Sequence, residues 1–425
     1  MSVAARLEEI RTGFERPFWV ANISEIFERL SYYGAFSSLA IYLQSKLNFS
    51  TEQTGTLTGL FGGMVWFLAI FGGAVADKLG FRRALSLAYL ILATAYFLIG
   101  SIGASWLGPV RNAVPLFWFV AAVLLVPALG ISLVKPSVVG TTARASQENV
   151  RSLGYSIYYT MVNIGGTAGP YVADWAHRHL GLEKVFRISS LSVFAMFFLV
   201  LFLFRDPRKH DDAPPPSIGQ VARNFVKILW PPQFLIFLLI FTGYWVVFWQ
   251  QYTSLPGFIQ TYVNPGARVE LILITDAAVV VCLTFIVNFL ARKIPPFRAV
   301  ILGTVVSSCS WLVLSFWPTI PGAVLSIFVL AIGEILQQPP YYAYISRLAP
   351  AGQQGTYLGF AFLPIGIGSL IGGWFGGRMM HHFGEVQHQP GHAWWAISAV
   401  GFVTAGLLLV YDYIVKPSRE ETTGG

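Results

Sequence analysis

Four side chains near the start of the chain have the types and the spacing to bind a charged solute or a proton. The positions i, i+3, i+4 and i+7 are held by Glu25, Glu28, Arg29 and Tyr32. This spacing puts all four on one face of a helix, with Glu25 one turn before Arg29. Two acids and one base leave the group unbalanced. Lys135 is the basic residue that could balance it.

These charges lie in segments that are too apolar for a water-soluble protein. Hydrophobic residues make up 55% of the 425 residues and charged residues 11%, whereas soluble domains carry about a quarter charged residues. A helix of roughly 20 apolar residues spans the hydrocarbon core of a bilayer. Charges retained in such helices cost a few kcal/mol each and therefore indicate function. A salt bridge that only locks two helices together is the simpler interpretation, and the two are compatible.

Charges and turn residues divide the chain into twelve predicted spans. They begin near residues 18, 54, 82, 113, 152 and 186, then near 231, 270, 298, 320, 353 and 393. The longest polar interval runs from Arg205 to Lys227 and contains a proline triplet, which is typical of a solvated linker. We expect an all-α membrane protein with two six-helix bundles at residues 1–204 and 231–425, joined by a cytoplasmic linker at 205–230.

The net charge of +8 follows the loops, because every second loop is basic. The basic residues are Arg6, Arg11 and Arg16; Lys78, Arg82 and Arg83; Arg144 and Arg151; Arg205, Arg208, Lys209, Arg223 and Lys227; and Arg292, Lys293 and Arg298. By the positive-inside rule this pattern predicts a multi-pass protein of the plasma (inner) membrane with both termini in the cytoplasm. No basic face with interleaved aromatics lies outside these loops, so we expect no nucleic-acid partner.

Motifs for enzymatic or metal chemistry are weak in this sequence. There is no GxxxxGK(S/T) phosphate loop, so we expect neither an enzyme nor an ATP-driven cycle. The glycines between Gly366 and Gly377 lie in an apolar span, where they let helices approach. Four histidines in the last predicted outer loop fit a solvated loop better than a metal site: His381, His382, His388 and His392. We expect no metal and no cofactor.

The loop after the second predicted span carries a family signature. GGAVADKLGFRRAL (Gly72 to Leu85) resembles the GxxxD(R/K)xGRR loop of the major facilitator superfamily. The resemblance implies two six-helix bundles with the substrate at mid-membrane. Matching positions include Gly73, Asp77, Arg82 and Arg83. We expect Gly73 to allow close helix packing and Asp77 to bond a neighbouring helix N-terminus in one state of the cycle.

Segments in both halves resemble the proton-coupled oligopeptide transporter (POT) family. EIFERLSYYG (Glu25 to Gly34) follows its ExxERFxYYG motif with one change, leucine for phenylalanine. The other matching segments are IYYTMVNIGG (157–166), the Lys-Pro pair at 135–136, GEILQQPPYYAYISRLAP (333–350) and GTYLGFAFL (355–363). The chain is therefore identified as a divergent member of this family.

The resemblance assigns binding roles. It implies that Arg29 and Lys135 hold the carboxylate of a di- or tripeptide and that Glu334 receives its amino group. It implies that Tyr32, Tyr33 and Asn163 contact the peptide backbone. Trp66, where the family tends to have tyrosine, is a candidate for an aromatic wall that accepts diverse side chains. A zwitterion of variable sequence offers only two fixed charges, so a site positive in one half and negative in the other recognises it without reading side chains. With the proton as coupling ion, protonation of a carboxylate would open the cluster of Glu25, Glu28, Arg29 and Lys135.

The seventh and eighth predicted spans depart from this family. In the seventh, Phe248 and Trp249 precede Gln250, where the family normally carries a glutamate that is linked to proton coupling. In the eighth, Asp276 stands where the family tends to have asparagine. If it faces the site, Asp276 could bind the proton or the amine. Alternatively, it caps the start of the eighth span.

Three functions are consistent with these residues. The first is a proton-coupled symporter that imports di- and tripeptides or related small zwitterionic or anionic solutes by alternating access, as a monomer in the bilayer. The second is a proton-driven efflux antiporter for amphiphilic compounds, because Gly165, Gly169 and Pro170 form a GxxxGP sequence that resembles the antiporter motif of drug exporters. The third is a non-transporting membrane receptor. The cationic pair favours the symporter.

Overall fold

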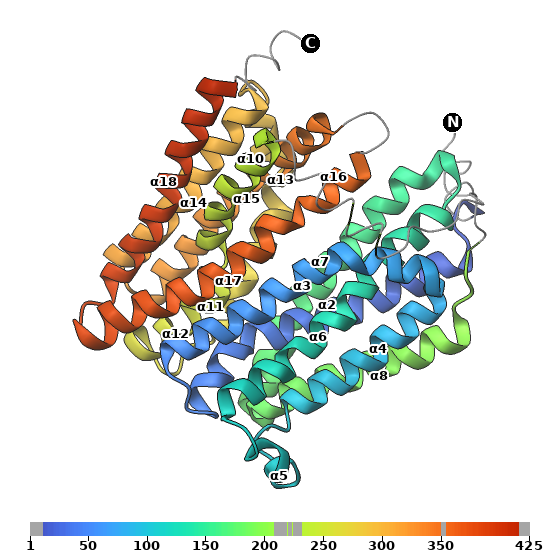
Figure 1. Cartoon of the computed structure of the whole chain (residues 1–425), viewed down its shortest axis with the longest axis horizontal. Helices are drawn as coiled ribbons and strands as arrows, with labels where there is room; N and C mark the ends of the chain where they lie inside the picture. The colour runs from blue at the N-terminus through green and yellow to red at the C-terminus, as the bar shows by residue number, and fades with distance from the viewer. Residues whose placement is uncertain (1–11, 208–218, 220–222, 224–231, 350–353, 416–425) are drawn as a thin grey trace. The chain divides into compact units, whose positions relative to one another are not determined.

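The computed structural model describes residues 12–207, 219, 223, 232–349 and 354–415, and its regular elements are helices (Figure 1). In this part of the chain the one isolated β-bridge joins Phe14 and Ser146. The first half contains α2 (Arg16–Ser45), α3 (Thr51–Leu79), α4 (Phe81–Ile99), η1 (Ser105–Leu107), α5 (Gly108–Arg111), α6 (Leu116–Arg144), η2 (Glu148–Val150), α7 (Arg151–Leu180) and α8 (Leu182–Leu203). The second half contains α10 (Pro232–Phe248), α11 (Gln250–Thr253), α12 (Leu255–Phe258), η3 (Ile259–Val263), α13 (Val269–Ala291), α14 (Pro296–Phe316), α15 (Ile320–Leu348), α16 (Gln354–Phe360), α17 (Phe362–Met379), η4 (Met380–Val386) and α18 (Gly391–Val415).

Ten of the twelve predicted helix starts agree with the structure to within about one turn. The starts predicted near residues 231 and 353, and most of the predicted linker at 205–230, lie outside the described residues. The largest displacement is that of the sixth predicted span, which was expected near residue 186 and begins at Leu182. Within the described residues, ten helical segments are long and apolar enough to cross a membrane. Two further helices, α2 and α7, have 30 residues each but are more polar. The prediction of an all-α membrane protein is thus confirmed.

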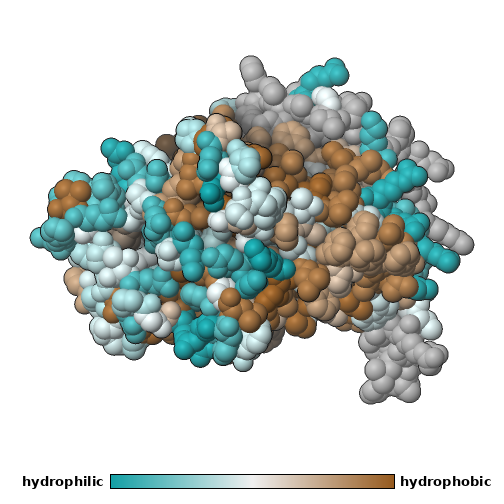
Figure 2. All heavy atoms as spheres, turned by 90° about the horizontal axis from the view of Figure 1, so that it is seen from below, coloured by the Kyte–Doolittle hydropathy of each residue, from teal (hydrophilic) through white to brown (hydrophobic). Residues whose placement is uncertain are grey.

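Large apolar side chains lie on the outside of the helices rather than only between them. The exposed fraction reaches 84% for Phe285 on α13, 73% for Phe202 on α8 and 80% for Tyr413 on α18. On the face drawn in Figure 2, apolar side chains gather over one part and polar side chains over another. Such patches would be a liability in water but are the expected surface of helices that face lipid.

The helices group into two compact units, which we describe separately. Unit 1 contains the described residues of Met1–Ser38 and Leu68–Arg223, and unit 2 those of Leu39–Phe67 and Asn224–Gly425. In unit 1, α4 packs against α6 and α8. In unit 2, α14 packs against α15 and α18, and α13 packs against α15 (Figure 1). Trp311 and Trp394 stack inside unit 2 with their ring centroids 4.8 Å apart.

The first half of α3 packs against α17 through glycines on both helices, all within unit 2. A Cβ atom added to Gly59 would lie 2.6 Å from the carbonyl oxygen of Ser369 and 2.9 Å from the Cα of Gly373. A Cβ on Gly373 would collide with Gly55 and Gly59 in turn. The Ser369 hydroxyl donates to the carbonyl of Gly59 at 3.1 Å. The glycines of the Gly366–Gly377 segment therefore serve close helix packing, as the sequence predicts.

Charged side chains join the same two helices where the glycine contact ends. Arg378 of α17 lies 3.3 Å from Glu52 at the start of α3. Glu385 of η4 accepts a hydrogen bond from Thr51 and lies 2.6 Å from the ring nitrogen of His381. His381 is half exposed and is thus part of a polar helix end, next to the contact that the glycines make.

We expect alanine to be harmful at Gly373 and harmless at Gly406. Gly406 of α18 has no atom within 4 Å of an added Cβ, so alanine there should raise the unfolding temperature, because alanine favours a helix over glycine by up to about 1 kcal/mol. Gly373→Ala should lower it, because overpacking costs about 1–3 kcal/mol. Thermal unfolding of both purified variants in detergent would test this. Equal shifts in the two variants would contradict the contact.

Candidate functional site

The charged face of α2 is buried inside unit 1. Glu25 and Glu28 are fully buried and Arg29 is 4% exposed. The Nε atom of Arg29 lies 2.5 Å from Oε2 of Glu28 and 3.5 Å from Oε1 of Glu25. The guanidinium also lies over the ring of Tyr32, 5.0 Å from its centroid. The predicted i, i+3, i+4 and i+7 face is therefore one connected cluster.

Lys135 reaches this cluster from α6. It interacts electrostatically with Arg29 and with both glutamates, so two acids and two bases gather in unit 1. The proline after it, Pro136, lies inside α6 and removes one backbone hydrogen bond there. The base that the sequence proposed as a balancing charge is thus placed beside the unbalanced group.

Helix α7 approaches the cluster because it carries glycines at the contact with α2. A Cβ on Gly165 would lie 2.7 Å from the Cβ of Arg29, and a Cβ on Gly169 would lie 2.9 Å from the backbone nitrogen of Gly34. The glycines of the GxxxGP sequence therefore hold α7 close to α2. A single side chain at either position would push α7 away from Arg29.

The α7 tyrosine beside the charges is Tyr158 and not its neighbour Tyr159. Tyr158 interacts electrostatically with Glu25, Glu28 and Arg29, whereas Tyr159 is 56% exposed. The amide of Asn163 donates to the backbone carbonyl of Tyr159 at 2.7 Å, so in this structure it bonds its own helix. The two tyrosines are adjacent in sequence and point about 100° apart on the helix.

Helix α4 supplies two tyrosines that sequence reasoning missed. Tyr89 and Tyr96 are buried and both interact electrostatically with Glu28 and Arg29. The hydroxyl of Tyr89 donates to Ser24 at 2.8 Å. Their spacing of seven residues puts them on one face of α4, which is the signal that could have identified them. On α2, the ring of Tyr33 meets that of Tyr32 edge-on at 5.1 Å.

The hydrogen-bonding capacity of the α2 cluster is only partly used. Both carboxylate oxygens of Glu25, Oε1 of Glu28 and Nη2 of Arg29 are buried without a hydrogen-bond partner among the described residues. Buried polar groups normally find partners. These atoms are therefore positioned to bind a proton, a water molecule or a polar solute.

The family loop after α3 is held by an ion pair within unit 1. Asp77 lies 3.1 Å from Arg144 in the last turn of α6, whose guanidinium lies 4.5 Å from the ring centroid of Phe81. The contact of Asp77 is thus with a basic side chain rather than with a helix N-terminus. The carboxylate that bonds a helix N-terminus here is that of Asp206, which accepts a hydrogen bond from the backbone nitrogen of Arg82, in the first turn of α4, at 2.9 Å. Arg83 is exposed.

The expectation that Gly73 allows close packing was wrong by one residue. A Cβ on Gly73 would lie 3.7 Å from the nearest atom, which is an ordinary contact, whereas a Cβ on Gly72 would collide with the carbonyl of Ser132 on α6. The atom nearest to the Cβ on Gly73 belongs to Pro136 of α6, so both glycines face this helix and Gly72 is the one at the close contact. Gly80 is the glycine of this loop that the backbone conformation favours, because its φ of +81° lies in the left-handed region.

A second group of polar side chains lies inside unit 2. Asp276 stands in the interior of α13, beside Gln251 of α11 and Glu334 of α15. The alternative that Asp276 caps the start of its helix is therefore wrong. Glu334 accepts from Gln338 at 2.6 Å, and Tyr244 of α10 interacts with both acids. Oδ1 of Asp276 and Oε2 of Glu334 have no hydrogen-bond partner in the described part of the chain.

The two adjacent glutamines after α10 have different surroundings. Gln250 donates to the carbonyls of Val246 at 2.7 Å and of Gly372 at 2.9 Å, so it fastens α11 to α17. Gln251 is the one beside Asp276. Trp66, predicted as an aromatic wall, packs its ring 5.3 Å from that of Phe362 in unit 2.

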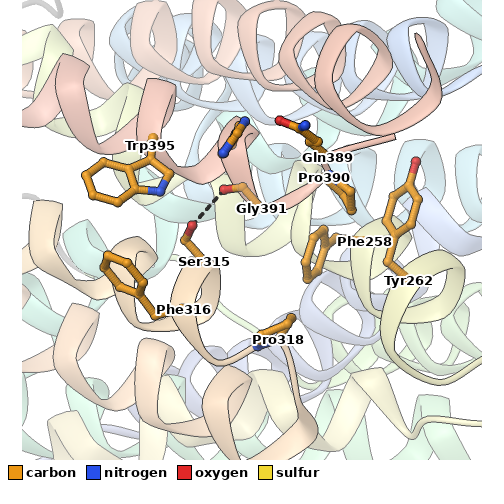
Figure 3. Close-up of a pocket in the computed structure, with 10 residues that line it drawn as sticks. Phe258, Tyr262, Ser315, Phe316, Pro318, Gln389, Pro390, Gly391 and Trp395 are labelled. Carbon is orange, nitrogen blue, oxygen red and sulfur yellow. Dashed lines mark hydrogen bonds between the residues drawn. The ribbon is translucent and has the colours of Figure 1, made fainter. Parts of the chain in front are cut away.

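A separate pocket of about 830 Å³ opens in unit 2 between η3, α14 and the start of α18 (Figure 3). Its lining includes four aromatic side chains, Phe258, Tyr262, Phe316 and Trp395, together with Gln389 and His392. Burial raises the pKa of the Tyr262 hydroxyl, and the nearby Glu385 carboxylate raises it further. None of the predicted site residues lines this pocket.

Membrane-crossing helices with buried, incompletely paired charges define a transport protein of the bilayer. A family model of the Major Facilitator Superfamily matches residues 22–373 of this chain. The chain therefore belongs to the Major Facilitator Superfamily, a family of membrane transporters and not of enzymes.

Relatives and solved structures give further comparisons. The multidrug resistance protein MdtH of Salmonella arizonae is 21% identical over 400 residues, 93% of each chain, and that of Salmonella newport is 22% identical over 380 residues, 88% of this chain and 89% of the relative. A POT family transporter in complex with 5-aminolevulinic acid has a TM-score of 0.75 at 14% identity, covering 93% of this chain and 96% of that one. The nucleoside transporter NupG, as a mutant, has a TM-score of 0.74 at 13% identity, covering 93% and 99%. These structures share the fold with this chain.

Removing Arg29 should destabilise unit 1 strongly. Arg29→Met leaves two carboxylates buried, and loss of one member of a buried pair costs about 3–5 kcal/mol. Arg144→Met is the matched control, because the Asp77–Arg144 pair is about one third exposed and such pairs contribute at most about 1 kcal/mol. Thermal unfolding in detergent should show a much larger fall for Arg29→Met, partly restored by adding Glu28→Gln. Similar falls in both single variants would mean that Arg29 compensates no buried charge.

Proposed function

We propose that this protein is a proton-coupled symporter that imports di- and tripeptides, or related small zwitterionic or anionic solutes, by alternating access. The observation that carries the proposal is the unit 1 cluster. Two bases, Arg29 and Lys135, stand with two acids in a buried site whose hydrogen-bonding atoms are partly unused. A lock between two helices would need one acid and one base. The additional pair suggests exchangeable partners.

The chemistry of the exchange follows from charge. A substrate carboxylate competes with Glu25 and Glu28 for the two cations. Protonation of a buried carboxylate removes one negative charge and releases cationic hydrogen-bond donors for the substrate. Tyr158, Tyr89 and Tyr96 interact with the same charges and suit a substrate that carries amide groups as well as a carboxylate.

Unit 2 offers the complementary chemistry. Asp276 and Glu334 are two acids whose interacting neighbours are polar but uncharged in the described residues. An ammonium group is the natural partner of such a pair. One fold neighbour was crystallised with 5-aminolevulinic acid, a compound with one amine and one carboxylate, and this supports a bipolar substrate for the present chain.

We extend the proposal to the topology. Helices α2 and α7, at about 45 Å for 30 residues, are long enough to cross the bilayer and would complete twelve spans in two six-helix bundles. The basic loops favour cytoplasmic termini and a place in the inner membrane. We propose residues 1–204 and 231–425 as the bundles, residues 205–230 as the linker, a monomer as the working unit, and the proton as coupling ion without a further cofactor.

A second candidate function is proton-driven efflux of amphiphilic compounds. It is favoured by the relatives named multidrug resistance protein MdtH, which align over about nine tenths of the chain. The two candidates differ in direction. A symporter accumulates solute on the side toward which protons flow, and an antiporter accumulates it on the opposite side. A chain that moves neither class of solute would fit the receptor alternative.

Labelled dialanine should accumulate in proteoliposomes when an inward proton gradient is imposed, and Lys135→Ala should reduce uptake at least tenfold. The charge of Lys135 would be required for the substrate carboxylate. Uptake that ignores both the gradient and Lys135→Ala would rule out symport. Accumulation of an amphiphilic dye against the proton flow, with no dialanine uptake, would establish the efflux candidate instead.

Substitutions of the two adjacent tyrosines of α7 should have different effects on transport. Tyr158→Phe should raise the KM for dialanine several-fold, because its hydroxyl stands beside the charged cluster. Tyr159→Phe should leave KM unchanged, because that side chain is 56% exposed. Initial uptake rates over a range of dialanine concentrations would give both constants. A KM change confined to Tyr159→Phe would contradict the assignment.

A further inference from the structure

The aromatic pocket of unit 2, named for Phe258, Tyr262, Phe316 and Trp395, shares no lining residue with the two groups of buried charges. We propose that this pocket binds the headgroup of a phospholipid that carries an ammonium group, such as phosphatidylethanolamine or phosphatidylcholine. Its volume of about 830 Å³ is within the range of sites that enclose small molecules. The proposal goes beyond transport and does not depend on which solute the protein moves.

The aromatic pocket lies at the ends of membrane-crossing helices. Its lining includes Phe316, the last residue of α14, and Gly391, the first residue of α18. Both helices are long and apolar enough to cross a bilayer, and a span of roughly 20 residues is needed for the hydrocarbon core alone. The end residues of these helices therefore lie at the boundary between hydrocarbon and water, where phospholipid headgroups are found.

Two side chains belong both to the aromatic pocket and to the outer surface. Phe316 and Trp395 line the pocket and are also exposed, with their rings edge-on at 5.2 Å. Tryptophan is enriched at the membrane–water interface, because its ring is apolar and its N–H is polar. A lipid whose chains lie along α14 or α18 would therefore have its headgroup beside the opening of the pocket.

Two aromatic pairs stand on different sides of the pocket (Figure 3). Phe316 and Trp395 form one pair, and Phe258 and Tyr262 form the other, with ring centroids 5.6 Å apart. Phe258 is buried and packs edge-on against Trp394 at 5.1 Å, so the core of unit 2 holds it in place. The faces of aromatic rings are electron-rich and attract ammonium groups. An ammonium group in this pocket would have such rings on two sides.

The charges near the aromatic pocket also favour a cation. Among the described residues that line it there is no aspartate, glutamate, lysine or arginine. The Tyr262 hydroxyl rests against η4, because a Cβ on Gly384 would lie 2.4 Å from it. The next residue, Glu385, acts electrostatically on the same hydroxyl. Glu385 is bonded to His381, which leaves the negative charge in place while the imidazole is neutral.

The phosphate of the headgroup needs donors, and the start of α18 supplies them. Gln389 and His392 line the pocket there, and a glutamine amide and an imidazole each carry an N–H donor. The 25-residue helix α18 begins between them, and the dipole of a helix favours an anion at its N-terminus. A headgroup with a phosphate next to its ammonium therefore suits the lining better than a cation alone.

Native mass spectrometry of the purified protein in detergent tests the site, because a lipid titration gives a dissociation constant for bound lipid. Trp395→Leu should weaken the binding of phosphatidylcholine and phosphatidylethanolamine at least fivefold. It should leave phosphatidylglycerol of the same chain length unaffected, because that lipid has the phosphate but no ammonium. Trp317→Leu is the matched control, since Trp317 is 48% exposed and Trp395 is 46% exposed, and only Trp395 lines the pocket. Trp317→Leu should change none of the three affinities.

Three results would overturn the proposal. The first is unchanged phosphatidylcholine binding in both Trp395→Leu and Phe316→Leu, of which the second repeats the test if the first variant fails to fold. The second is an equal loss of phosphatidylglycerol, which would mean that the pocket recognises acyl chains. The third is displacement of the lipid by tetramethylammonium at equal concentration, which would indicate a site for a free cation. The titration contains no dialanine, so a failure of the proposed symport would leave its result unchanged.

Discussion

The arrangement of unit 1 depends on the burial of Arg29 between two glutamates. A charge away from water is tolerated only with partners close by, and Arg29 lies 2.5 Å from Glu28 and 3.5 Å from Glu25. This requirement decides what the neighbouring helices must contribute. Helix α6 brings Lys135, and α7 approaches through Gly165, which has no side chain to collide with Arg29. The glycine is therefore as necessary to the charged site as the charges themselves.

Unit 2 meets the same physical constraint in another way. Asp276 is buried and Glu334 partly buried, with glutamines and tyrosines as neighbours. No cation is among those described neighbours, whereas Arg29 and Lys135 stand beside the glutamates of unit 1. The acids of unit 1 therefore have cationic partners, and those of unit 2 have polar, uncharged ones.

The sequence predicted those features that depend on periodicity within one helix. The charged face of α2 and the helix starts follow from spacing and apolar runs, and the structure agrees with both. The errors concern which residue of a helix faces which neighbour. Gly72 rather than Gly73 makes the close contact with α6, and Asp276 lies beside Glu334 instead of capping α13. Each residue step turns the side chain by about 100°. Periodicity therefore shows which residues share a helix face, but it does not show which neighbouring helix that face packs against.

The glutamines at 250 and 251 show how far this ambiguity extends. The residue matched to the family's glutamine, Gln250, is fully occupied by hydrogen bonds to Val246, Gly372 and Ser254. Its neighbour, Gln251, stands beside Asp276. The Gln250 amide is thus bonded to α10, to α17 and to the residue after α11, and it cannot turn toward another partner without breaking these bonds. The adjacent residue has no such task, because both of its amide atoms lack a hydrogen-bond partner among the described residues. Gln251, one position after the motif, is thus the glutamine of α11 that stands beside an acid, and the family pattern does not contain that acid.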